Sequence, residues 1–252
     1  MCYVRNAFHS DHYRKTHMQI KNSTVLVTGA NRGIGAEFVR QLKERGAAKI
    51  YATARNADSI STDGVVAVTL DITDDGQIEA VAARATDVQL LINNAGISSG
   101  ADLVSGDLDT IRHDLETNFF GPLKLTRAFA SILATNGGGA ILNVLSAAAW
   151  FTAPGATSYA LSKAAAWSLT DATRVELAAQ GTQVTGLHMA MVDTDMTAGI
   201  DVPKASPAAV VTAALDGIES GATEVLADVV TVQLKAGLHL DPTERYGTMI
   251  RA

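Results

Sequence analysis

The chain has 252 residues, of which 47% are hydrophobic and 18% charged, and its formal net charge is −6. These values exclude a disordered chain, and the negative charge argues against non-specific nucleic-acid binding. The single cysteine, Cys2, allows neither a disulfide framework nor a CxxC metal site, so we expect a protein of the reducing cytoplasm. No stretch approaches the ~18 consecutive apolar residues of a membrane span, so no membrane partner is expected.

Residues 1–17 differ from the rest of the chain because they are polar, mixed in charge and without apolar periodicity. We expect them to form a flexible, dispensable extension to a single domain over residues 18–252. His9, His12 and His17 lie in this segment, but nothing nearby completes the three or four ligands of a metal site. No metal is therefore predicted.

Apolar, β-branched runs alternate with helical periodicity along the remaining chain. The first run, TVLVT, has no polar alternation, which is typical of a strand buried on both faces of a parallel sheet. The alternation predicts an α/β fold: a single-domain, Rossmann-type, doubly wound parallel sheet of about seven strands flanked by helices. The predicted strands are 24–28, 50–54, 65–70, 88–93, 140–145, 183–188 and 223–227, and the main predicted helices are 36–45, 110–134, 159–180 and 206–220.

The segment after the first predicted strand, TGANRGIG over residues 28–35, is rich in glycine. Gly29 allows a tight turn out of the strand, Gly33 allows the phosphates of a dinucleotide to approach, and Gly35 allows the helix to pack closely on the sheet. The helix N-terminus then offers free N–H groups and partial positive charge to a pyrophosphate. Its place between a strand and a helix favours a dinucleotide site over a purely structural turn.

The spacing Gly-x-x-x-Gly-x-Gly resembles the cofactor motif of the short-chain dehydrogenase/reductase family. Over residues 18–227 further family motifs follow in order: Asp71 after the third strand, Asn93-Asn94-Ala95-Gly96 after the fourth, Asn118 in the long helix, Ser146 at the end of the fifth strand, Tyr159-x-x-x-Lys163 at the next helix, and Val192-Asp193-Thr194-Asp195-Met196 after the sixth strand. The chain departs from the family at Met189-Ala190, where Pro-Gly is usual, and at Leu145 and Ala149, where Ser and Gly are usual. The resemblance implies a nicotinamide-dependent oxidoreductase without naming its substrate.

Tyr159 and Lys163 are four residues apart on a predicted helix, so their side chains leave the same face. A phenol has a pKa near ~10, and a neighbouring ammonium favours its ionised form, which suits Tyr159 to exchange a proton with a carbonyl or alcohol oxygen. Ser146 follows a strand and is placed to hydrogen-bond that oxygen, although a loop cap is the plainer interpretation. The resemblance implies catalytic roles for all three residues, ribose binding by Lys163, and a proton-relay water held by the Asn118 backbone.

The second predicted strand ends without the carboxylate that binds the ribose 2′-hydroxyl in enzymes that use NAD, and Arg55 follows it. Arg32 lies in the glycine turn, close to the same ribose in this family, so the two guanidinium groups favour NADP(H) over NAD(H). The alternative is that Arg55 starts a solvated loop. The predicted cofactor-binding residues are Gly29, Asn31, Arg32, Gly33, Ile34, Gly35, Arg55, Asp71, Ile72, Asn93, Ala95, Gly96, Tyr159, Lys163, Val192 and Thr194.

The substrate is expected between the loops that follow the fourth, fifth and sixth strands. The predicted wall residues are Ile97, Ser146, Trp150, Phe151 and Met191, with Ala153 and Met189 beside them, and each apolar one fits a core position equally well. These side chains predict a partly apolar pocket suited to an aromatic or alicyclic carbonyl compound, so the expected partner is a small-molecule carbonyl or alcohol substrate. The resemblance implies a homo-oligomer, a dimer or tetramer, formed through the two long central helices.

Three alternatives to a reductase or alcohol dehydrogenase remain at this point. One is a dinucleotide-binding regulatory or signalling protein with little turnover, against which the complete catalytic set argues. Another is a nucleotide-sugar epimerase or dehydratase, which uses a different glycine spacing and a larger carboxy-terminal lobe. The third is a hydrolase triad of Ser146, His188 and Asp193, but Ser146 lies in Leu-Ser-Ala rather than in a Gly-x-Ser-x-Gly elbow.

Overall fold

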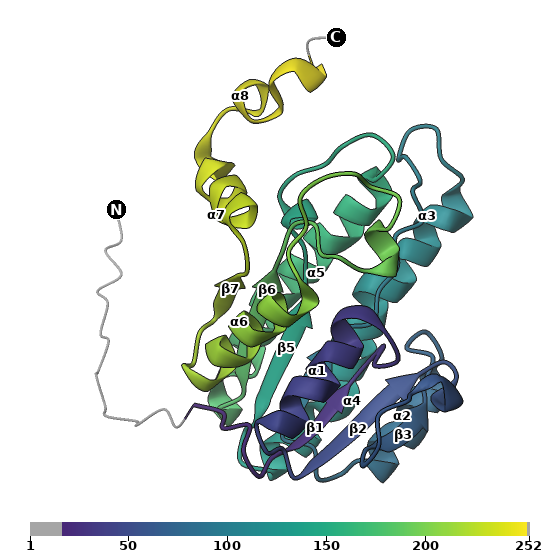
Figure 1. Cartoon of the computed structure of the whole chain (residues 1–252), viewed down its shortest axis with the longest axis vertical. Helices are drawn as coiled ribbons and strands as arrows, with labels where there is room; N and C mark the ends of the chain where they lie inside the picture. The colour runs from purple at the N-terminus through teal and green to yellow at the C-terminus, as the bar shows by residue number, and fades with distance from the viewer. Residues whose placement is uncertain (1–16, 251–252) are drawn as a thin grey trace, which may run out of the picture.

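The computed structural model describes residues 17–250, so nearly all of the predicted extension lies outside the described residues. The predicted doubly wound sheet is confirmed: seven parallel strands lie in the order β3-β2-β1-β4-β5-β6-β7 (Figure 1). The sequence direction reverses between β1 and β4, where such sheets bind ligands at their carboxyl ends. The strands are β1 Thr24–Val27, β2 Lys49–Ala54, β3 Val66–Thr69, β4 Leu90–Asn93, β5 Ala140–Val144, β6 Gln183–His188 and β7 Glu224–Leu226.

Helices cover both faces of the sheet. The helices α1 and α6 lie on the near face in Figure 1, where Phe38, Leu42 and Leu215 pack against the strands. On the other face α2 supplies Ile78 and Val81, and α4 supplies Leu125 and Phe129. The helices are α1 Gly33–Glu44, α2 Asp75–Arg84, α3 Leu108–Leu115, α4 Gly121–Thr135, α5 Thr157–Glu176, α6 Pro207–Glu219, α7 Val229–Ala236 and α8 Pro242–Tyr246.

The central strands have apolar sequences because helices cover both faces of the sheet. Leu26 of β1 pairs with Tyr51 of β2 and with Leu91 of β4, and all three residues are at least 97% buried. Because both faces of such a strand are inside the protein, polar alternation would bury unpaired polar groups. The expected strand positions therefore agree with the observed ones to within one or two residues at most ends.

The central helix differs from the prediction of one continuous α-helix over residues 110–134. A π-helical turn, Glu116–Phe120, separates α3 from α4 and contains Asn118. Pro122 follows in the first turn of α4, and because proline has no N–H it cannot donate to the carbonyl of Asn118, four residues earlier. A π-turn inserted into a helix in this way is frequent at functional sites.

The C-terminal helices were not predicted. In Figure 1, α7 and α8 leave the body of the protein after β7 and extend beyond the carboxyl ends of the strands. The start of α7 is attached to the sheet through Asp228, which accepts hydrogen bonds from the amide of Thr231 at 2.8 Å and from the amide of Ala190 at 2.7 Å. Across residues 17–250, none of the helices combines the length and the apolar character that a membrane crossing requires.

Candidate active site

The glycine turn between β1 and α1 combines left-handed glycines with an uncapped helix start. Gly29 and Gly33 have φ angles of +63° and +53°, in the left-handed region that favours glycine. A Cβ on Gly35 would lie 2.0 Å from the Gly29 carbonyl oxygen, so only glycine lets α1 approach the turn this closely. The start of α1 has no acid in its first turn and no side-chain cap from the described part of the chain. Its free N–H groups therefore fit an anion.

The ends of β1 and β4 are joined by Thr28 and Asn94. The Thr28 hydroxyl oxygen accepts hydrogen bonds from the amides of Asn94, at 2.9 Å, and Ala95, at 3.0 Å. In return, the Asn94 side-chain amide donates to the Thr28 carbonyl at 2.8 Å and to the Gly29 carbonyl at 3.2 Å. Thr28 and Asn94 are not among the predicted cofactor-binding residues, although the hydroxyl at the strand end and the second asparagine after β4 are visible in the sequence. The pair fixes the glycine turn beside the loop after β4.

Other predicted cofactor residues line the same edge of the sheet. Asp71 is half-buried after β3, and its Oδ1 accepts hydrogen bonds from the amide and hydroxyl of Thr73 at 2.9 and 2.7 Å. Ile72 is buried against α4, where a Cβ on Gly121 would lie 2.7 Å from the Ile72 Cδ1. Asn93 points into the core instead, where its amide donates to the Asn143 side chain at 2.8 Å. The Asn93 side chain therefore does not face the cleft, and a contact with the cofactor through its backbone stays a prediction.

The segment after β6 lies beside the glycine turn. Thr194 is half-buried, and its Cγ2 would lie 3.4 Å from a Cβ on Gly33. Arg32 and Asp195 form an ion pair at 3.0 Å between these two segments, with side chains that are 69% and 72% exposed. Exposed pairs of this kind are weak, so Arg32 is available to a stronger anion. Val192 of the same segment is buried.

Arg55 lies directly after β2 with an exposed side chain, and it forms no ion pair with any residue from 17 to 250. Arg32 and Arg55 therefore follow β1 and β2, two neighbouring strands, at their carboxyl ends. The described residues at this edge leave both guanidinium groups exposed to solvent.

Tyr159 and Lys163 lie on the first turns of α5. The Lys163 Nζ is 5.7 Å from the centre of the Tyr159 ring and donates a hydrogen bond to the Val144 carbonyl at 2.9 Å. Lys163 is only 5% exposed, and this burial lowers the pKa of its ammonium to about 8. A lysine with this pKa exchanges its proton near neutral pH much more readily than an exposed one.

Tyr159 lies beside Ser146. Burial raises the pKa of Tyr159 above its ordinary value, a hydrogen bond with the Ser146 side chain opposes that rise, and the negative charge of Asp114 adds to it. Tyr159 therefore carries its proton at neutral pH in the absence of a bound cation. Ser146 follows β5 in extended conformation, and its Oγ also accepts a hydrogen bond from the Ala148 amide at 3.1 Å.

Asn118 is fully enclosed by the loop after β4 and by α5. Its side-chain oxygen accepts from the Ile97 amide at 2.9 Å, while its Nδ2 donates to the Ile97 carbonyl at 2.8 Å and to the Ser162 hydroxyl at 2.9 Å. A Cβ on Gly96 would lie 2.9 Å from the Asn118 Oδ1 and 3.6 Å from the Lys163 Nζ. The Asn118 side chain thus positions the loop. Its backbone carbonyl receives no α-helical hydrogen bond, because the residue four positions later is Pro122, which has no N–H.

The predicted wall residues separate into two groups. Ile97 and Met191 lie on the loops after β4 and β6, and Met191 is 40% exposed. Trp150 and Phe151 line a cavity of about 600 Å³ together with apolar residues of α5 and Tyr246 of the C-terminal segment. The Phe151 ring stacks on Tyr246, with ring centres 5.2 Å apart. Met189 is 4% exposed and belongs to the core, the alternative that its sequence position left open.

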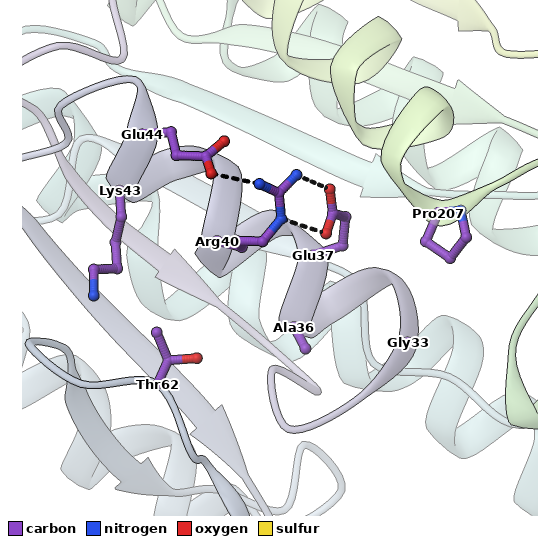
Figure 2. Close-up of a pocket in the computed structure, with 8 residues that line it drawn as sticks. All are labelled: Gly33, Ala36, Glu37, Arg40, Lys43, Glu44, Thr62 and Pro207. Carbon is purple, nitrogen blue, oxygen red and sulfur yellow. Dashed lines mark hydrogen bonds and ion pairs between the residues drawn. The ribbon is translucent and has the colours of Figure 1, made fainter.

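A second cavity, of about 570 Å³, lies on the outer side of α1 (Figure 2). Arg40 bonds Glu37 through two nitrogens, at 2.8 and 2.5 Å, and Glu44 through a third, at 2.5 Å. The Arg40 guanidinium is already paired with both carboxylates, and no predicted catalytic residue lines the cavity. We therefore place the chemistry at the carboxyl ends of β4, β5 and β6.

The hydrolase triad is not assembled. His188 contacts the carbonyl oxygen of Ser146 through Nδ1, at 3.2 Å, rather than the hydroxyl that a triad histidine would activate. Asp193 is exposed on the segment after β6. Among residues 17–250 no group of three His, Cys, Asp or Glu side chains could hold a metal ion.

The arrangement can move a proton and stabilise charge at one point of the cleft. A phenol, a neighbouring hydroxyl and a buried ammonium converge from α5 and the end of β5, beside a turn that fits a dinucleotide. Polarisation of a substrate oxygen by two hydroxyl donors is the contribution that hydride transfer to carbon needs from a protein.

Comparisons with known proteins agree with this arrangement. A structure of a short chain dehydrogenase from Burkholderia cenocepacia in complex with NADP has 38% sequence identity and a TM-score of 0.88, and covers 92% of this chain and 99% of that one. The 3-oxoacyl-(acyl-carrier-protein) reductase FabG of Vibrio cholerae is 32% identical over 194 residues, 73% of this chain and 79% of its own length.

Dehydrogenase/reductase SDR family member 7B of Rattus norvegicus is 32% identical over 197 residues, which are 71% of this chain and 60% of that protein. The chain therefore matches somewhat less than two thirds of the length of these mammalian relatives. A model of the short chain dehydrogenase family matches residues 23–204, from the start of β1 to the segment before α6. The chain belongs to the short-chain dehydrogenase/reductase family of oxidoreductases.

Proposed function

We propose that the protein is an NADP(H)-dependent oxidoreductase that reversibly transfers hydride between the nicotinamide and a carbonyl compound or secondary alcohol. The observation that carries the proposal is the convergence of three side chains: Tyr159 and Lys163 lie on the first turns of α5, with the Lys163 Nζ 5.7 Å from the centre of the phenol ring, and Ser146 follows β5 beside them. Two donors directed at one oxygen are suited to a carbonyl substrate.

Tyr159 is the acid/base in this proposal. In reduction its phenol donates a proton to the substrate oxygen, and in oxidation it removes one from the alcohol. Its raised pKa keeps the phenol protonated at neutral pH, which suits the acid role. A bound oxidised cofactor supplies the hydride acceptor and a positive ring that favours the phenolate needed for the reverse direction.

Ser146 and Lys163 support Tyr159. The Ser146 hydroxyl stabilises negative charge that develops on the substrate oxygen. Lys163, with its pKa lowered to about 8, supplies a positive charge beside the phenol and a proton that can replace the one Tyr159 donates. The Asn118 carbonyl, without a donor from Pro122, is a suitable acceptor for a water that connects Lys163 to solvent.

A preference for NADP(H) is supported by charge at the end of β2. Arg55 is exposed there and no carboxylate ends the strand, so a 2′-phosphate meets a guanidinium group rather than an acid. Arg32 approaches from the glycine turn, and NADP is present in the related structure from Burkholderia cenocepacia.

We also propose a homo-oligomer that forms through the long central helices. Leu161 and Val175 of α5 are 41% and 77% exposed, so both apolar side chains are open to contact with a second copy of the chain. Sedimentation or light scattering measures the assembly, and replacement of both residues by Glu is expected to dissociate it. A monomeric unmodified protein at micromolar concentration would contradict this part of the proposal.

The test of the function is NADPH oxidation across a panel of small apolar ketones and aldehydes. Tyr159→Phe keeps the ring and its packing but removes the transferable proton, so we expect kcat to fall by about 10² or more while the Kd for NADPH stays within about twofold. A protein that binds NADPH but turns over no member of the panel would favour the alternative, a dinucleotide-binding regulatory protein. Unchanged kcat in the Phe variant would contradict the role of Tyr159.

A further inference from the structure

His188 contacts the catalytic edge from inside the sheet. It is the last residue of β6 and only 1% exposed, and its Nδ1 lies 3.2 Å from the Ser146 carbonyl oxygen. The amides on either side of Ser146 donate to β6 and the residue after it, at 2.8 Å each: Leu145 to Leu187 and Ala147 to Met189. The main chain around Ser146 is therefore held by two backbone hydrogen bonds and by the contact with the His188 imidazole.

The imidazole is itself held on two further sides. Its ring stacks on Trp150, with centres 4.0 Å apart and planes 17° apart. Its Nε2 lies 3.5 Å from the Glu224 Oε1 on β7, and the other oxygen of that carboxylate bonds Lys235 of α7. The Lys235 Nζ also lies 5.1 Å from the centre of the Trp150 ring. The ring has one packed orientation, with Nδ1 toward Ser146.

The environment of His188 sets its protonation. Burial lowers the pKa of the imidazole to about 4, and the Lys235 charge acts in the same direction. The Ser146 carbonyl and the carboxylates of Glu224 and Asp171 oppose this shift. The ring is therefore neutral at pH 7. Both of its nitrogens face an acceptor, and we assign the single proton to Nδ1 because its contact with the Ser146 carbonyl, at 3.2 Å, is shorter than the 3.5 Å contact of Nε2 with Glu224. The Lys235 ammonium pairs with the Glu224 carboxylate, so this carboxylate attracts a second proton to the His188 Nε2 less strongly.

We propose that His188 is a positioning residue for Ser146, and this inference rests on the proposed function. The Nδ1–H fixes the main chain of Ser146, and the hydroxyl that the proposed function directs at the substrate oxygen belongs to the same residue. Catalytic hydroxyls must be held within roughly 0.5 Å, and a displacement of about 1 Å can reduce the rate by about 10². His188 thereby lies between the Glu224–Lys235 ion pair and Ser146, whose hydroxyl contacts the substrate oxygen in the proposed function.

Three substitutions separate the hydrogen bond from the volume of the side chain. His188→Leu fills the site but has no donor, His188→Asn keeps an N–H near the position of Nδ1, and His188→Gln moves the N–H to the position of Nε2. We expect kcat with an accepted ketone to fall about 10-fold in the Leu and Gln variants and less than about threefold in the Asn variant. The KM for NADPH should stay within about twofold in all three, because the cofactor turn is not in contact with His188.

Thr185→Val is the matched control. Thr185 is a fully buried polar residue on the same strand, and its hydroxyl donates to the Ala222 carbonyl at 2.6 Å, away from Ser146. Its replacement should lower the melting temperature and leave kcat unchanged. A loss of kcat equal to that of His188→Leu would show that general loosening of β6 suffices, and would overturn the inference.

The outcomes distinguish this inference from the proposed function. If the unmodified protein turns over no carbonyl compound with NADPH, the proposed function fails and the inference fails with it. If it turns over a ketone and folded His188→Leu is equally active, only the inference is overturned. If His188→Leu does not fold, the Asn and Gln variants decide: higher kcat in Asn supports the inference, and equal kcat in both contradicts it.

Discussion

Burial is the largest cause of the pKa shifts of both Lys163 and Tyr159, because it penalises the charged form of each. It lowers the pKa of the ammonium to about 8 and raises the pKa of the phenol. Both groups are thus moved toward the neutral form before any ligand binds. A positive nicotinamide ring or a negative substrate oxygen then has a large effect, because little solvent is present to screen it.

The lowered pKa of Lys163 predicts a pH dependence of stability in the cofactor-free protein. An unfolded lysine has a pKa near ~10.5, so between pH 8 and that value the unfolded chain binds more protons than the folded one. The contribution to stability is therefore present at high pH and is lost as pH falls through about 8. We expect the free energy of unfolding to rise by about 1–2 kcal/mol between pH 8 and 9.5 from this group.

Denaturant titrations of the unmodified protein and Lys163→Met across that range measure the effect. The Met variant should lose the rise, and Lys21→Met, which replaces an exposed lysine, should keep it. The same pH slope in Lys163→Met as in the unmodified protein would contradict the assignment. The range stops at pH 9.5 because Tyr159, with its raised pKa, contributes in the opposite direction at higher pH.

At the scale of the element, the strand-to-helix turns position most of the site. The turn from β1 to α1 is held by Asn94 of the loop after β4 and faces Thr194 of the segment after β6. The turn's shape depends on close backbone approach, since Gly35 packs against the Gly29 carbonyl. Changes that separate these backbones should affect cofactor binding and stability together.

Gly35→Ala tests the close approach. The added methyl group would lie 2.0 Å from the Gly29 oxygen, so α1 must move away from the turn. We expect a fall in melting temperature of about 5 °C or more and a Kd for NADPH at least about 10-fold higher. Gly199→Ala is the control, because a Cβ there meets nothing within 4 Å of the described structure and should change neither value. Normal NADPH binding by the Gly35→Ala variant would contradict our account of the turn.

The end of β2 is the element that we expect to select the cofactor. Arg55→Asp replaces the proposed phosphate ligand with an acid that can accept from a ribose 2′-hydroxyl. The ratio of kcat/KM for NADPH to that for NADH should fall by about 10-fold or more, the effect of one charge-assisted contact. Arg127→Asp, an exposed change on α4, should leave the ratio unchanged. If the unmodified protein already prefers NADH, the roles of Arg32 and Arg55 are wrong.

At the scale of the whole molecule, the doubly wound sheet was the most predictable feature. Runs such as Thr24–Val27 show no polar alternation because both of their faces are covered, and this pattern is local and strong. Motifs such as Tyr159 and Lys163 were likewise readable, because their spacing on one helix determines that they share a face. The proximity of Ser146 to Tyr159 followed from the family resemblance and the edge at which parallel strands end.

Other features depend on contacts between distant segments, which a single sequence does not specify. Helix α7 exposes Val229, Val230 and Val232, so it has no buried stripe that would predict it. The π-turn at Asn118 shares its apolar pattern with an α-helix, and only Pro122 indicates it. Trp150 packs on His188 because the backbone of the loop after β5 directs it there. Side-chain direction in loops follows tertiary packing rather than local sequence.

The most direct test of the central claim is the fate of the hydride. NADPH that carries deuterium at its transferable position is incubated with the protein and an accepted ketone, and the alcohol product is analysed by mass spectrometry. We predict that one deuterium per molecule is transferred to the carbinol carbon of the product, with one stereochemistry, and that Tyr159→Phe slows its formation by about 10² or more. An alcohol without deuterium, or formation at the same rate by the Phe variant, would contradict hydride transfer with Tyr159 as the proton donor.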